Sequence, residues 1–124
     1  MNLTILKVCS GAKPEVVTIP HDLKCMQEIV GGCIEAFYPF EDSVALVCND
    51  EGKLMNLPLN RAIRDPETGT ILDIISGTFF ICGLSEYGFA SLSKEQIDYY
   101  SNLFRYPELF LQSESQFLIL QMEP

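Results

Sequence analysis

Apolar and polar residues alternate along the first twenty positions in the pattern of two short strands joined by a turn. Leu3, Ile5 and Cys9 fall on one face of the first strand, since successive side chains of a strand point to opposite faces. Turn-forming residues at 10–14 separate this strand from a second β-prone run at 16–19. These positions predict an N-terminal β-hairpin.

The pattern then changes to helical spacing. Four apolar side chains share one helix face, namely Leu23, Met26, Ile29 and Val30. Asp22 can accept hydrogen bonds from the free amides of the first turn, and Gly31 tolerates the left-handed backbone that ends many helices. A helix is therefore expected between Asp22 and Gly31.

A second helix has the clearest local signal in the chain. Ser93 and Gln96 have the spacing of a capping box, and Leu92 with Ile97 has the spacing of a hydrophobic staple. Further apolar residues continue on one side of this helix, at Tyr100, Leu103 and Phe104. The helix should end before Pro107, because the residue that precedes a proline avoids helical geometry.

The middle of the chain is predicted to be extended. A short strand at 34–38 is limited by Pro39, and the continuous apolar run at 44–48 indicates a strand buried on both faces. A turn at 49–52 follows, after which 53–55 is expected to return as a hairpin partner.

Three more apolar runs complete the expected sheet. Two β-prone segments at 71–75 and 77–82 are broken by a serine and a glycine, and a final strand is expected at 116–121. Four consecutive apolar residues in that last run favour a central position in the sheet. The prediction is one α+β domain over 1–124, with a mixed, mostly antiparallel sheet and two covering helices.

The composition indicates that the fold needs no disulfides, metal or cofactor. A length of 124 residues with 48 % apolar content supplies a core without disulfides. No apolar run is long enough to span a bilayer, and no signal peptide is expected at the start of the chain. The five cysteines include no CxxC pair and His21 is the single histidine, so we expect buried thiols in a reducing cytoplasm, no metal site and no cofactor.

The net charge of −9 argues against direct nucleic-acid binding, which requires a basic surface. A minor alternative is an acidic mimic of nucleic acid. Such mimicry needs a dense carboxylate stripe, whereas the seventeen acidic residues are spread along the whole chain.

Support for catalysis is weak. No GxSxG or Walker motif is present. A small hydrolase could use His21 or a pair of carboxylates on either side of a cleft. The candidate carboxylates fall in two groups, Glu35 with Glu41 and Asp42, and Asp65 with Glu67 and Asp73.

The arginines of segment 57–65 form the best candidate for a binding site. Arg61 and Arg64 would face one anion if Asn60–Arg64 formed a helical turn, which Asn60 could cap. The alternative is that either arginine pairs internally with Asp65, Glu67 or Asp73. Aromatic clusters at 37–40, 87–89 and 99–106 would mark a partner surface if exposed, and core if buried.

Five segments together resemble a known family. They are Met26–Gly32, Ile34–Glu35, Asp50–Lys53, Leu57–Ala62 and Asp73–Ile81. The resemblance spans about residues 3–110 and is to domain of unknown function 3846, a family of small acidic proteins from Gram-positive bacteria, their phages and mobile elements. It implies an accessory role of a mobile element in its host, with counter-defence as one form of it. It implies no catalytic residues, and it marks Gln27, Glu28, Asn60, Arg61 and Asp73 as positions to test.

The leading hypothesis is a non-enzymatic, cytoplasmic binding module that engages a host protein or sequesters a small anionic ligand. Asn60, Arg61 and Arg64 would supply the polar contacts to the partner or the anion. Glu35, Tyr38 and Asp73 would be their neighbours. No membrane association is expected, and a homodimer stays open because the last strand could pair across a two-fold axis if it lies at an edge.

Overall fold

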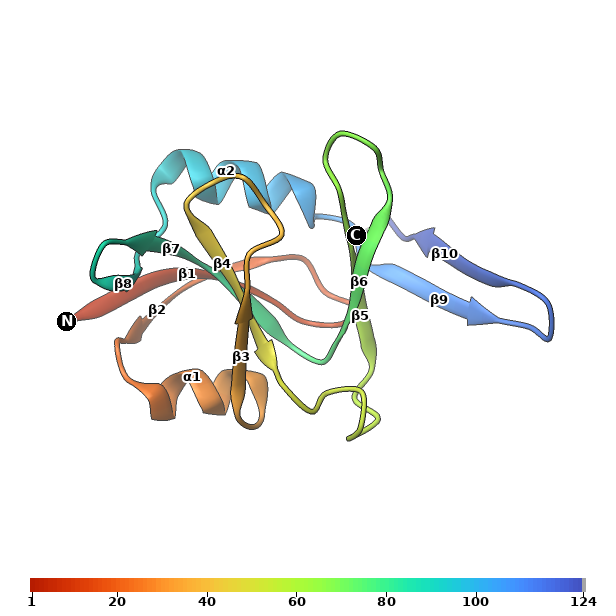
Figure 1. Cartoon of the computed structure of the whole chain (residues 1–124), viewed down its shortest axis with the longest axis horizontal. Coiled ribbons are helices and arrows are strands. Elements are labelled where there is room, and N and C mark those ends of the chain that lie inside the picture. Colours follow the sequence, from red (N-terminus) through yellow and green to blue (C-terminus); the bar gives the residue numbers. More distant parts are fainter. Residues whose placement is uncertain (124) are drawn as a thin grey trace.

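A computed structural model describes residues 1–123, and within them the chain forms ten strands and two helices (Figure 1). Six strands build the main sheet: β1 (Asn2–Val8), β2 (Glu15–Pro20), β3 (Ile34–Phe37), β4 (Val44–Asn49), β7 (Phe79–Ser85) and β8 (Gly88–Ala90). The strand order is β2-β1-β7-β4-β3, and β8 pairs with the end of β7. The expected α+β class holds, with strands dominating. Every pairing in the main sheet is antiparallel, so this sheet is not mixed.

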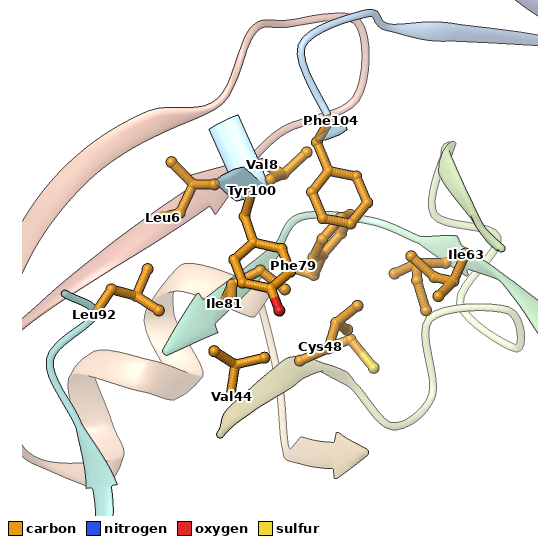
Figure 2. Packing of buried hydrophobic residues seen from close by; sticks show 12 residues of the cluster. Leu6, Val8, Val44, Cys48, Ile63, Phe79, Ile81, Leu92, Tyr100 and Phe104 are labelled. Atoms are coloured by element: carbon orange, nitrogen blue, oxygen red, sulfur yellow. The ribbon is translucent and has the colours of Figure 1, made fainter. Parts of the chain in front are cut away.

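The main sheet is covered on both faces. Helix α1 (Leu23–Val30) lies on one side and helix α2 (Lys94–Leu103) on the other (Figure 1). Alternate residues of the central strands separate two cores: Leu46 belongs to the core on the α2 side, shown in Figure 2, and Val47 to the core on the α1 side. All six residues of β4 are buried, which confirms the prediction of a strand buried on both faces.

Local capping signals correctly located both helices. The Asp22 side chain accepts a hydrogen bond from the Cys25 amide at 2.8 Å, and Gly31 has φ of 81° at the end of α1. Ser93 and Gln96 form the predicted capping box in front of α2. The first hairpin also forms as expected, since β1 pairs with β2.

A second sheet consists of the hairpin β5 (Leu59–Arg64) and β6 (Ile71–Ser76). The helical turn considered for residues 60–64 is wrong, because this segment pairs with β6 and buries Ala62 and Ile63. The strand expected at 53–55 is also wrong, because these residues form turns instead. In the first of these places strand pairing overrides the local pattern.

A third sheet is the hairpin β9 (Glu108–Gln112) and β10 (Phe117–Gln121), which projects away from the body of the molecule (Figure 1). The predicted central position of the last strand is wrong. Within residues 1–123 β10 pairs only with β9, and Leu118 is 50 % exposed. The partner strand β9 and the short strand β8 were not predicted.

None of the helices in residues 1–123 has the length and apolar character that crossing a membrane requires.

Candidate functional site

A groove of about 490 Å³ lies where three separate segments meet. The loop before β4 contributes one wall, the tip of the β5–β6 hairpin the second, and α2 the third. We call it the acidic–aromatic groove, and its lining residues are Pro39, Phe40, Glu41, Asp42, Asp65, Pro66, Glu67, Tyr99 and Tyr100.

Three neighbouring aromatic rings, tilted or edge-on to one another, form one wall of this groove. The centroid of the Phe40 ring lies 5.2 Å from that of Tyr100, and the Tyr99 centroid lies 4.8 Å from Tyr100. Tyr100 is buried, whereas Tyr99 is 52 % exposed. The groove therefore offers an accessible ring beside a fixed one.

Asp42 is held in place by its neighbours. Its carboxylate accepts hydrogen bonds from the Tyr100 hydroxyl at 3.1 Å, the Gln96 side-chain amide at 3.1 Å and the Ser43 backbone amide at 2.7 Å. Burial, together with this hydrogen bond to Asp42, raises the pKa of Tyr100 well above its usual range. The hydroxyl therefore stays protonated and continues to donate.

The groove is strongly acidic. Four carboxylates line it and no basic side chain does. Asp65 accepts hydrogen bonds from the Glu67 and Thr68 amides in the hairpin turn, whereas within residues 1–123 the carboxylates of Glu41 and Glu67 accept no hydrogen bond from the protein. These two groups are thus free to bind a cation.

Arg61 lies elsewhere and is 1 % exposed. All five of its N–H donors are used by protein oxygens: the Phe104 carbonyl at 3.2 and 3.0 Å, the Ala12 carbonyl at 2.6 Å, and the carbonyl and side-chain oxygens of Asn60 at 3.3 and 2.9 Å. Burial lowers the pKa of Arg61, and the nearby Glu108 opposes that effect.

The acidic partner of Arg64 is Glu108, at 2.8 Å, and not Asp65, Glu67 or Asp73 as the internal alternative supposed. The Glu108 side chain is 3 % exposed and also accepts a hydrogen bond from the Ala62 amide at 2.9 Å. This carboxylate therefore joins the base of β9 to β5.

Asn60 is fully buried and caps no helix. Its amide donates to the Val8 carbonyl at 2.9 Å and to the Gly77 carbonyl at 2.8 Å, so it joins the end of β1 to the turn after β6.

Glu35 and Asp73 were expected beside the arginines of segment 57–65. They line instead a pocket of about 130 Å³ at the other end of β4, and neither arginine is among its lining residues. Asp73 is paired there with Lys53 at 2.8 Å. Burial, with Glu35 and Asp73 nearby, raises the pKa of the Cys48 thiol to about 11.

The other candidate residues lie apart from both pockets. Tyr38 is 60 % exposed at the end of β3, and His21 is exposed before α1. Gln27 and Glu28 lie on α1.

The cysteines are free thiols within residues 1–123, where no group of three His, Cys, Asp or Glu side chains is arranged to hold a metal. Cys48 and Cys82 are buried as expected. Cys33 is exposed, so the expectation of burial is wrong for that residue.

Sequence reasoning noted the components of the groove but not their assembly. It grouped Asp42 with Glu35 and Asp65 with Asp73, whereas the structure brings Asp42 and Asp65 to the same groove. The aromatic clusters at 37–40 and 99–106 were the one available signal, and both contribute rings to the groove.

A family model described as "Domain of unknown function (DUF3846)" matches residues 1–105. No curated protein and no solved structure matches the chain.

Proposed function

The chain belongs to the DUF3846 family, and we propose that it is a non-enzymatic module that binds a basic segment of a partner protein in its acidic–aromatic groove. The observation that carries the proposal is the combination of four carboxylates, an accessible ring and the absence of any basic lining residue.

This combination suits an arginine or lysine side chain. The aliphatic stem would pack against the rings of Phe40 and Tyr99, because lysine and arginine bury their methylene groups along apolar surface and leave the charged end free. The charged end would meet Glu41 and Glu67, whose carboxylates have unused acceptor positions. Charge-assisted hydrogen bonds of this kind are roughly twice as strong as neutral ones.

The same geometry favours a protein partner over a small anionic ligand. Arg61 has no donor left for a ligand, and Arg64 is paired with Glu108. A groove lined by carboxylates repels anions.

The two alternative functions find less support. A hydrolase that combined Arg61 with His21 or Glu35 would need them in one pocket, and Glu35 lines a different pocket from Arg61. The carboxylates that do meet in one place, in the acidic–aromatic groove, have no histidine or arginine among the lining residues. A nucleic-acid mimic would need one acidic stripe, whereas the acidic residues of the two pockets gather at opposite ends of β4.

The cellular setting is part of the proposal. The family resemblance to proteins of phages and mobile elements makes a host protein the expected partner, with counter-defence as one outcome. Five free thiols suit a reducing cytoplasm.

The test is a titration of isotope-labelled protein with two blocked pentapeptides, Gly-Arg-Gly-Arg-Gly and Gly-Glu-Gly-Glu-Gly, followed by amide chemical shifts. We expect the arginine peptide alone to shift the amides of residues 40–42, of Asp65 and Glu67, and of residues 96–100, and we expect its binding to weaken as salt is raised. The double variant Glu41→Gln, Glu67→Gln should bind it about tenfold more weakly, a loss of about 1.4 kcal/mol.

The matched control is Glu15→Gln, Glu86→Gln, which removes the same charge at exposed positions outside the groove. It should change the affinity less than twofold. Equal losses of affinity in the two double variants would show that only the net charge matters, and would reject the groove as the binding site. An arginine peptide that shifts no groove amide would reject it as well.

A further inference from the structure

The hairpin of β9 and β10, which we call the arm (residues 108–121), exposes apolar side chains on a segment that projects from the body (Figure 1). Four leucines share one of its faces as two cross-strand pairs, Leu109 with Leu120 and Leu111 with Leu118. Their exposed fractions lie between 42 and 50 %. We call this the leucine face.

The opposite face of the arm is also apolar. Phe110 and Phe117 lie there with their ring centroids 6.2 Å apart, and Ile119 pairs with Phe110 across the strands. A two-stranded hairpin is marginally stable in water by itself, and contiguous exposed apolar patches mark interaction sites.

The base of the arm is firmly attached to the body. Arg64 and the Ala62 amide bind Glu108 at the start of β9, and the Met122 amide donates to the Pro107 carbonyl at 2.7 Å after β10. The arm is thus held out by buried polar contacts at its base while its leucines remain uncovered within residues 1–123.

We infer that the leucine face binds the leucine face of a second copy of this chain across a two-fold axis. A two-fold contact requires a surface that is complementary to itself, and a square of four leucines meets this requirement. Faces of two such hairpins can pack about 10 Å apart, as stacked sheets do.

Charge restricts a contact between two copies to the arm. The chain carries a net charge of −9, so two copies repel each other over most of their surfaces. The arm from 109 to 121 contains one charged residue, Glu114, and it lies in the turn at the tip. A basic partner would instead be attracted to the acidic pockets of the body.

The exposed apolar area is part of what a dimer contact needs. Five side chains of the leucine face and the end of the arm are 42–50 % exposed: Leu109, Leu111, Leu118, Leu120 and Met122. Together they present on the order of 400 Å² of apolar surface, about half of the roughly 800 Å² that each partner buries in a standard interface. The expected contact is therefore smaller than a standard interface, and the test extends to high protein concentration for that reason.

The test is sedimentation equilibrium of the full chain between 1 and 100 μM. We expect a dimer for the unmodified protein and a monomer at the same concentrations for Leu111→Glu, Leu118→Glu, because this pair would place four carboxylates at the centre of the contact. A monomeric unmodified chain at 100 μM would overturn the inference.

The matched control is Ile71→Glu, Leu72→Glu, which adds the same charge at positions of β6 with 45 and 50 % exposure. It should remain dimeric with the same dissociation constant. An arm variant that stays dimeric, or a control that dissociates equally, would also overturn the inference.

Thermal unfolding of both variants separates dissociation from misfolding, because the body should melt cooperatively in each. Titration with the arginine peptide separates this inference from the proposed function. The arm variant should bind that peptide as the unmodified protein does, whichever way the groove experiment comes out.

Discussion

Arg61 shows how a charged side chain can serve packing and hydrogen bonding within one small domain. Within residues 1–123 its guanidinium forms no ion pair with a carboxylate. It joins the turn after β1 at Ala12, strand β5, and the end of α2 at Phe104. Because each of its donors has an oxygen partner, its removal would leave buried carbonyls without hydrogen bonds.

We therefore expect Arg61→Ala to lower the free energy of unfolding by on the order of 3 kcal/mol, since unsatisfied buried acceptors cost about 1–3 kcal/mol each. Arg61→Lys should recover little of this, because an ammonium cannot reach three separate sites as a planar guanidinium does. Urea unfolding measures both changes.

Arg105→Ala is the control, because Arg105 is exposed and, within residues 1–123, its side chain bonds only to near neighbours in the sequence. It should change stability by less than about 0.5 kcal/mol. If Arg61→Ala matched this control, the buried hydrogen bonds of Arg61 would have no net effect on stability.

The sequence singled out Asn60 and Arg61 as unusual polar residues in an apolar segment, and both are indeed in special positions. Their partners could not be predicted, because they are backbone carbonyls of Val8, Ala12 and Phe104, far away in the chain. Every residue has a backbone carbonyl, so the residue type does not show which carbonyl will accept a given hydrogen bond.

Elements with local signals were the predictable ones. Both helices begin at a side-chain cap and were located correctly, because a cap and its amides lie within three residues of each other. The strand β5 was not predictable, since its extended form depends on pairing with β6 after a turn at 65–70. The last strand was wrongly predicted to be central in the sheet, because an apolar run does not show whether the residues that bury it belong to the same chain.

The cap of α2 predicts that Ser→Ala changes the stability differently at two positions of this region. Ser93→Ala should destabilise the protein by about 1 kcal/mol, because it removes the side-chain acceptor of the Gln96 amide at 3.1 Å. Ser101→Ala, inside the same helix, should be neutral or slightly stabilising, because alanine is the better helix former. Thermal unfolding of the two variants measures these changes. Equal losses of stability would show that the capping box does not stabilise the helix.

At the scale of the whole molecule, two cores share the central strands. The thiol of Cys48 belongs to the core on the α2 side and that of Cys82 to the core on the α1 side. Burial raises the pKa of Cys48 to about 11 and that of Cys82 to about 12, from the ordinary value of 9.0. The groove exists only at this scale, because its walls come from residues 39–42, 65–67 and 99–100.

These thiols predict a stability that falls as pH rises above 9. In that range the unfolded chain has lost the thiol protons that the folded chain still holds, so raising the pH favours unfolding by up to about 1.4 kcal/mol per pH unit for each thiol. The effect is absent below pH 8 and continues towards pH 11–12, where the folded thiols also ionise.

Cys82→Ala should reduce the slope of the unfolding free energy against pH by up to about 1.4 kcal/mol per pH unit, which corresponds to one proton. Urea unfolding in reductant between pH 7.5 and 10 measures this slope. Cys33→Ala, which removes an exposed thiol, is the control. A slope unchanged by Cys82→Ala would mean that this thiol ionises alike in the folded and unfolded chain.

The hydrogen bonds of Arg61 also bear on the order of folding. They join residues 43 and 49 positions apart, so we expect them to form late, once the main sheet has brought α2 and the first turn together. Contacts made after the folding transition state slow unfolding and leave the folding rate nearly unchanged. On this expectation the buried guanidinium prolongs the lifetime of the native state more than it speeds folding.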